Sequence, residues 1–149
     1  MATLLDYRAS IGSKTFGSPG SVMSTSSTTP SYIGSIGLIV GNATGIRVQL
    51  QGEIGVAATS APATVTITIV KNASPDPTLP AGGRTILTQN YTLESTIAKT
   101  IAINAADLDP TPGPSTPGQI SYSMFAQNSA GNSIIRTGPE NFAGLAMTD

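Results

Sequence analysis

The alternation of residues 46–56 constrains the fold of this chain more than any other part of its sequence. Apolar and polar side chains take turns along it: Ile46, Val48, Leu50, Ile54 and Val56 against Arg47, Gln49, Gln51 and Glu53. A period of two with polar partners is typical of a half-buried β-strand, because successive side chains point to opposite faces. Gly52 interrupts the apolar series, and it predicts a bulge or a close backbone approach at that point.

Further segments give strand patterns, and no segment gives a convincing helical one. Residues 64–70 put Val65, Ile67 and Ile69 on one face and threonines on the other, and β-branched threonine suits a solvated strand face. The other expected strands are 36–40, 85–93, 97–103, 119–127, 133–137 and 142–148. About eight short strands predict an all-β fold, a single antiparallel jelly-roll β-sandwich with an extended N-terminal arm. The expected core between its two sheets contains Ile46, Val48, Leu50, Val65, Ile67 and Ile69.

Turn and loop residues separate the expected strands. Residues 41–45 and 128–132 are typical of turns, and the longer loops 72–83 and 105–118 hold seven of the eleven prolines. If successive strands run antiparallel, the connections alternate between the two ends of the sandwich. One end then carries the loops 41–45, 72–83 and 105–118, and the other carries 57–63, 94–96 and 128–132.

The N-terminal segment has a different composition from the rest. Residues 17–31 are a low-complexity Ser/Thr/Gly/Pro stretch, typical of a linker that contributes little to a core. The residues before it carry the apolar side chains Leu4, Leu5, Tyr7, Ile11 and Phe16. We expect this arm to pair with another subunit rather than with its own domain, as in donor-strand complementation; a frayed terminus is the alternative. The expected organisation is a connector at 1–16, a linker at 17–31 and a jelly-roll domain at 32–149.

Composition argues against most catalytic and metal-binding chemistry. The chain has no His, Cys or Trp, only 10% of its residues are charged, and its formal net charge is −1. Without His or Cys there is no Ser-His-Asp triad, no thiol nucleophile and no usual zinc ligand set. The low charge gives no footprint for nucleic acid, and no stretch approaches about 20 apolar residues. We expect a protein that is not an enzyme, with no cofactor, no nucleic-acid partner, no signal peptide and no membrane insertion.

Two sets of carboxylates are the remaining candidates for chemistry. Glycoside hydrolysis needs two carboxylates, and three glutamates could supply them: Glu53, Glu94 and Glu140. We favour solvated surface charges, because no tryptophan is present to hold a sugar. Calcium binding in the Pro-rich loops is a second hypothesis, with three candidate ligands: Asp76, Asp107 and Asp109. The favoured interpretation of these aspartates is turn formation beside Pro and Gly.

Three stretches carry a resemblance to a known family. They are VTITIVKN at 65–72, TIAKTI at 96–101 leading into 107–117, and NFAGLA at 141–146. They resemble the F-type endospore appendage subunits and related exosporium proteins of spore-forming bacteria. In such proteins a jelly-roll domain carries an N-terminal connector, and subunits stack by β-strand augmentation into thin fibres. The chain is also similar to the tip domains of collagen-like exosporium proteins, but it lacks their Gly-X-Y stalk.

The resemblance implies a structural subunit of an extracellular or spore-surface filament. Related appendage types use connector cysteines for cross-links, so a chain without cysteine would assemble non-covalently. The partner would be a second copy, contacted head-to-tail through Leu4, Leu5, Tyr7, Ile11 and Phe16, with an anchor protein and a tip protein as further partners. The alternative is a trimeric or carbohydrate-binding recognition module, at a spore-surface tip or in a phage structural protein.

Overall fold

A computed structural model gives the fold of the chain and describes residues 1–13, 20–72, 83–112 and 117–149. Its strands are β1 (Thr3–Ser13), β2 (Ser31–Ile39), β3 (Ile46–Ala58), β4 (Ala63–Asn72), β5 (Arg84–Leu93), β6 (Lys99–Leu108), β7 (Gln119–Gly131) and β8 (Ile134–Thr148). The described ranges contain no helix, and therefore none that could cross a membrane.

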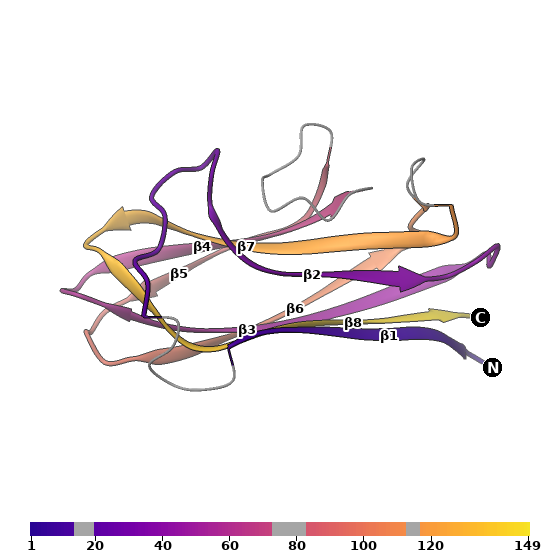
Figure 1. Cartoon of the computed structure of the whole chain (residues 1–149), viewed down its shortest axis with the longest axis horizontal. Helices are drawn as coiled ribbons and strands as arrows, with labels where there is room; N and C mark the ends of the chain where they lie inside the picture. The colour runs from indigo at the N-terminus through magenta and orange to yellow at the C-terminus, as the bar shows by residue number, and fades with distance from the viewer. Residues whose placement is uncertain (14–19, 73–82, 113–116) are drawn as a thin grey trace.

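The strands form two four-stranded antiparallel sheets that pack face to face (Figure 1). Sheet A has the order β1-β8-β3-β6, and sheet B has the order β2-β7-β4-β5. This order is that of an eight-stranded jelly roll, so the predicted fold class is confirmed. All pairings are antiparallel, and the two termini lie at one end of the sandwich (Figure 1).

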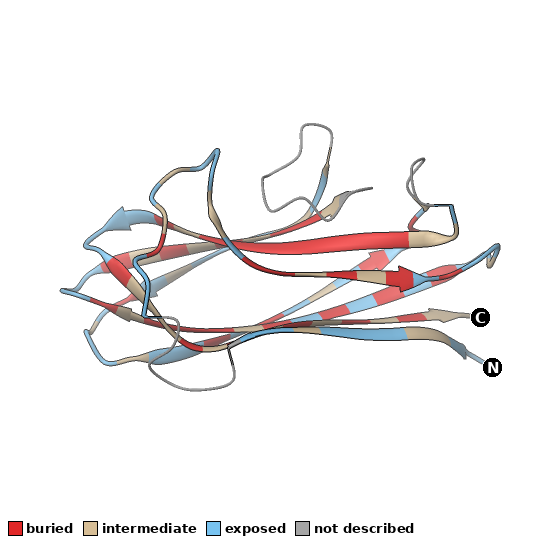
Figure 2. Ribbon diagram, viewed as in Figure 1, coloured by how far each residue is buried: buried red, intermediate tan, exposed pale blue. Residues whose placement is uncertain are grey.

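The core lies between the two sheets, on the faces that the alternation selects (Figure 2). All six predicted core residues belong to one buried cluster, with exposed fractions between 0% and 4%. Gly52 marks a close approach, because a Cβ there would lie 2.5 Å from the Met124 sulfur. The predicted alternative of a bulge at Gly52 is wrong, since the β3–β8 register shift falls between Ile54 and Val56.

The predicted number of eight strands is correct, but the eight strands are not the expected ones. Segments 133–137 and 142–148 belong to one long strand, β8, which bends at Gly138, where φ is +64°. A Cβ on Gly55 would lie within van der Waals overlap of the Gly138 carbonyl, so the bend of β8 requires glycine opposite it. The eighth strand is β1, which lies in the segment expected to be a detached arm.

The N-terminal arm pairs with its own domain, which corrects the expectation that it would pair only with another subunit. β1 is extended as expected, but it runs antiparallel to β8 of the same chain, from Thr3 opposite Thr148 to Ser13 opposite Glu140. Without β1 sheet A would have three strands, so the jelly roll begins at residue 3 rather than at residue 32.

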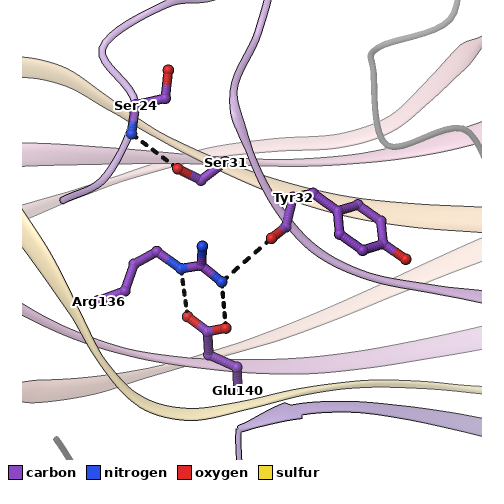
Figure 3. A network of polar contacts seen from close by, with 5 residues as sticks. All are labelled: Ser24, Ser31, Tyr32, Arg136 and Glu140. Atoms are coloured by element: carbon purple, nitrogen blue, oxygen red, sulfur yellow. Dashed lines mark hydrogen bonds and ion pairs between the residues drawn. The ribbon is translucent and has the colours of Figure 1, made fainter. Parts of the chain in front are cut away.

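The described part of the expected linker is docked on the domain. Met23 is 1% exposed and belongs to the core, and Val22 forms an isolated bridge with Ile135 of β8. The amide of Gly20 donates to the Arg136 carbonyl at 2.9 Å. The amide of Ser24 donates to the Ser31 hydroxyl at 2.9 Å (Figure 3). Residues 20–31 therefore act as a packed connection and not as a free linker.

Candidate functional site

The surface of sheet A that faces away from the core carries little charge. The strand registers align its outward side chains in four rows across the sheet. From β1 through β8 and β3 to β6 the rows are Leu4-Met147-Arg47-Leu108, Tyr7-Leu145-Gln49-Ala106, Ala9-Ala143-Gln51-Asn104 and Ile11-Asn141-Glu53-Ala102. We call these positions the outer face. Its two charges are Arg47 and Glu53, and its other side chains are apolar groups, amides and the phenol of Tyr7.

The outer face is hollowed where small side chains lie between large ones. One hollow is lined by Tyr7, Gln49, Gln51, Ala143, Gly144 and Leu145. A second hollow lies nearer β6 and is lined in part by Arg47, Asn104, Ala106, Leu108 and Met147. Amide and apolar groups line these depressions, and Arg47 is the one charged residue among their described lining residues, so the face offers mainly shape and hydrogen bonds.

The predicted interaction residues of the N-terminal arm have different environments. Leu5 packs against the core, whereas Leu4, Tyr7 and Ile11 are 61%, 59% and 56% exposed and lie on the outer face. Phe16 lies outside the described residues. Among the described strands β1 is an edge of sheet A, so the main-chain groups on its outer side pair with none of the other seven.

Asp6 ties β1 to the opposite sheet. Its Oδ2 accepts the backbone N–H of Ile39 in β2 at 2.9 Å and the Arg8 Nε at 3.0 Å, and its Oδ1 accepts the N–H of Tyr7. Burial acts to raise the pKa of Asp6, but the hydrogen bonds from Ile39, Arg8 and Tyr7 lower it below its usual value. The ionised carboxylate is therefore the form that holds β1 and β2 together.

The calcium candidates are not gathered into one described site. Asp107 belongs to β6 and not to a loop; it is 5% exposed, accepts the Tyr122 hydroxyl at 2.9 Å and pairs with Lys71 Nζ at 3.2 Å. Burial and the neighbouring carboxylate raise the pKa of Tyr122. Asp109 follows β6 with a φ of +50°, and Asp76 lies outside the described residues. Within the described ranges no group of three acidic side chains could hold a metal ion.

The three glutamates lie in three different environments. Glu140 is 1% exposed and accepts Arg136 Nε at 2.7 Å and Nη2 at 2.5 Å, and the same guanidinium donates to the Tyr32 carbonyl at 3.4 Å (Figure 3). The interpretation as a solvated charge is therefore wrong for Glu140. Glu53 Oε2 accepts a hydrogen bond from the side-chain amide of Asn141 on β8 at 2.7 Å. Glu94 is exposed.

Sequence reasoning missed most of the outer face. It noted Gln49 and Gln51 only as the polar half of an alternation, and it did not single out Leu145 or Met147. One signal was available: residues 142–148 are apolar at odd and even positions alike, as expected for a strand covered on both faces.

No protein-family model and no curated protein matches the chain. A structure of infectious bursal disease virus, Gt strain, matches with a TM-score of 0.45 and 15% identity over 93% of this chain and 32% of that one. The Eiger TNF of S. frugiperda matches with a TM-score of 0.41 and 17% identity, over 71% of this chain and 60% of that one. A putative sugar binding protein from Bacteroides thetaiotaomicron matches with a TM-score of 0.41 and 9% identity, over 80% of this chain and 69% of that one. The chain thus spans less than two thirds of the first two, and no functional statement about it follows from these matches.

Proposed function

We propose that the chain is a structural subunit that assembles non-covalently with copies of itself into an extracellular or spore-surface filament, and that β1 is the exchanged element. The observation that carries this proposal is how β1 is attached. It pairs with β8 along its length, yet it leaves Leu4, Tyr7 and Ile11 exposed and packs only Leu5 against the core. Main-chain pairing of this kind is the basis of β-strand addition between chains.

Exchange of β1 requires movement of one strand only. A six-residue connection, 14–19, separates Ser13 from Gly20, and the segment that begins at Gly20 is bonded to β8 of its own chain. A β1 from a neighbouring copy would make the same pairs with β8 as the chain's own β1 makes. If each copy gives its β1 to the next, the contact repeats without closing, and a filament grows.

A pair of cysteines tests this exchange directly, because the chain has no cysteine of its own. Thr3 and Thr148 lie opposite each other in the β1–β8 ladder and away from the outer face. We expect Thr3→Cys with Thr148→Cys, oxidised after assembly, to give a ladder of disulfide-linked multimers on a non-reducing gel, and fibres by negative-stain microscopy. Such a ladder forms only if the two cysteines belong to different copies.

The control pair is Thr66→Cys with Asn90→Cys. Thr66 of β4 lies opposite Asn90 of β5 and its hydroxyl donates to the Asn90 carbonyl oxygen at 2.7 Å, so this disulfide closes within one chain. We expect only monomer from the control. If the β1–β8 pair also gives only internally linked monomer at high protein concentration, β1 stays in its own chain and the exchange hypothesis fails.

A recognition module is the second candidate, and one observation favours it. The hollows of the outer face combine the ring of Tyr7 with the amides of Gln49, Gln51 and Asn104, and such groups bind sugars by stacking and hydrogen bonding. Binding of a glycan panel that is lost on Gln49→Ala, in a chain that does not polymerise, would favour this function over the first.

A further inference from the structure

We propose that the outer face of sheet A binds the outer face of a second copy. The two copies are related by a two-fold axis that lies between the two faces and runs across the strands at the level of Leu50 and Gly144. These two residues lie opposite each other at the middle of the face and point inward. This contact goes beyond the filament proposed above, because it is lateral and does not use exchange of β1.

The charges of the outer face are arranged for such a contact. Arg47 and Glu53 lie on the same strand, three residues before and three residues after Leu50. A two-fold rotation about an axis at Leu50 therefore places Arg47 of each copy towards Glu53 of the other. The side chain of Arg47 is 57% exposed, and its ion pair with Asp149 of its own chain is an exposed one, which contributes little. Arg47 is thus available to a second copy.

The shapes of the side chains follow the same symmetry. The rotation places Tyr7 on Ala9 of the other copy, Leu145 on Ala143 and Leu108 on Ala102, so that a large side chain meets a small one at these places. At the outer rows Leu4 meets Ile11 and Met147 meets Asn141, which adds apolar contact at the rim. Gln49 meets Gln51, and paired amides can exchange hydrogen bonds. The hollow lined by Tyr7, Gln49, Gln51, Ala143, Gly144 and Leu145 lies at the level of the axis.

Self-complementarity identifies the occupant as a second copy. A two-fold contact uses the same patch on both subunits, so each residue must fit its symmetry mate. A partner of another kind would not require opposite charges at Arg47 and Glu53, the two positions of β3 that the rotation exchanges. Two sheets that pack face to face lie about 10 Å apart with strands inclined by about 30°. The pairs near the axis then fit closely, and the long side chains of Arg47 and Glu53 reach across the remaining offset.

A charge swap tests the contact. The background is the full chain with the Thr3–Thr148 cysteine pair oxidised in dilute solution before assembly, and a non-reducing gel of a sample confirms that the disulfide is internal, so that β1 is fixed in its own chain. By analytical ultracentrifugation we expect this protein to form dimers. Arg47→Glu alone, or Glu53→Arg alone, sets like charges opposite each other at two symmetric places and should weaken dimerisation by about tenfold or more.

An equimolar mixture of the two single variants should restore the dimer, because every contact in the mixed pair again joins opposite charges. The chain that carries both Arg47→Glu and Glu53→Arg should dimerise with itself for the same reason. Glu94→Arg and Lys99→Glu change exposed charges outside the four rows by equal amounts, and they should leave dimerisation unchanged.

The proposal is overturned if the disulfide-linked background, with Arg47 and Glu53 unchanged, stays monomeric at millimolar concentration. The face would then be left to another ligand. It is also overturned if the mixture dimerises no better than each single variant. Neither result bears on β1 exchange, which the disulfide ladder measures separately.

Discussion

Replacing Ile67 by alanine measures how firmly β4 is packed in the core. Ile67 is fully buried and lies between β5 and β7, opposite Gln89 and Ala126. The substitution removes three buried carbons, worth about 0.8 kcal/mol each by transfer, or about 2.4 kcal/mol together. The cavity adds to this, and isoleucine-to-alanine changes in cores cost about 2–5 kcal/mol. For a domain of this size a loss of about 3 kcal/mol lowers Tm by about 6–12 °C.

The neighbouring Thr66 supplies the control for Ile67→Ala. Its side chain points to the other face of β4, is half-buried, and makes one hydrogen bond, to Asn90. Thr66→Ala should therefore cost about 0.5–1.5 kcal/mol. Both free energies of unfolding can be measured by urea titration with far-UV circular dichroism, at equal protein concentration. If Ile67→Ala destabilises the protein no more than Thr66→Ala does, the assignment of the inner face of β4 is wrong.

Two further predictions concern the contacts that hold the N-terminal region. Because the folded-state pKa of Asp6 is depressed, its contribution to stability is fully present above its ordinary pKa of 3.8 and is lost as pH falls through the lower folded-state pKa. In that pH range β1 amides should lose hydrogen-exchange protection, and Asp6→Asn should abolish this pH dependence. An unchanged profile in Asp6→Asn would contradict the role of this carboxylate. Arg136→Met leaves the Glu140 carboxylate buried without its partner, so it should lower the free energy of unfolding by about 3–5 kcal/mol and speed proteolysis within residues 20–31. Adding Glu140→Leu to this variant should recover much of the lost stability. A single variant as stable as the double one would show that the buried pair does not hold this segment.

The inner faces of the central strands could be predicted from the sequence residue by residue. In 46–56 and 64–70 the side chains alternate with a period of two, which follows from the geometry of an extended chain and needs no knowledge of a partner strand. Once the apolar positions are known, the buried face is known. Ile46, Val48, Leu50, Val65, Ile67 and Ile69 are accordingly all in the core.

The environment of individual polar residues was harder to predict. Glu140 and Asp107 are nearly fully buried, although a local pattern places such residues on the surface or in a loop. Each is buried because a cation reaches it: Arg136 reaches Glu140 from four residues earlier in β8, across the bend at Gly138, and Lys71 reaches Asp107 from the opposite sheet. Burial of a charge depends on its partner in space, which a local reading of the chain does not show.

The sequence by itself therefore determined the inner faces of the central strands and the absence of His and Cys, since composition and local geometry are properties of the chain alone. Only the tertiary structure decided that β1 completes sheet A beside β8, at the far end of the chain, and that the expected linker is docked through Met23. It also decided the outer face, because its rows exist only when four strands are aligned in register. Such pairings join residues distant in the sequence, and no periodicity within one segment encodes the register of another.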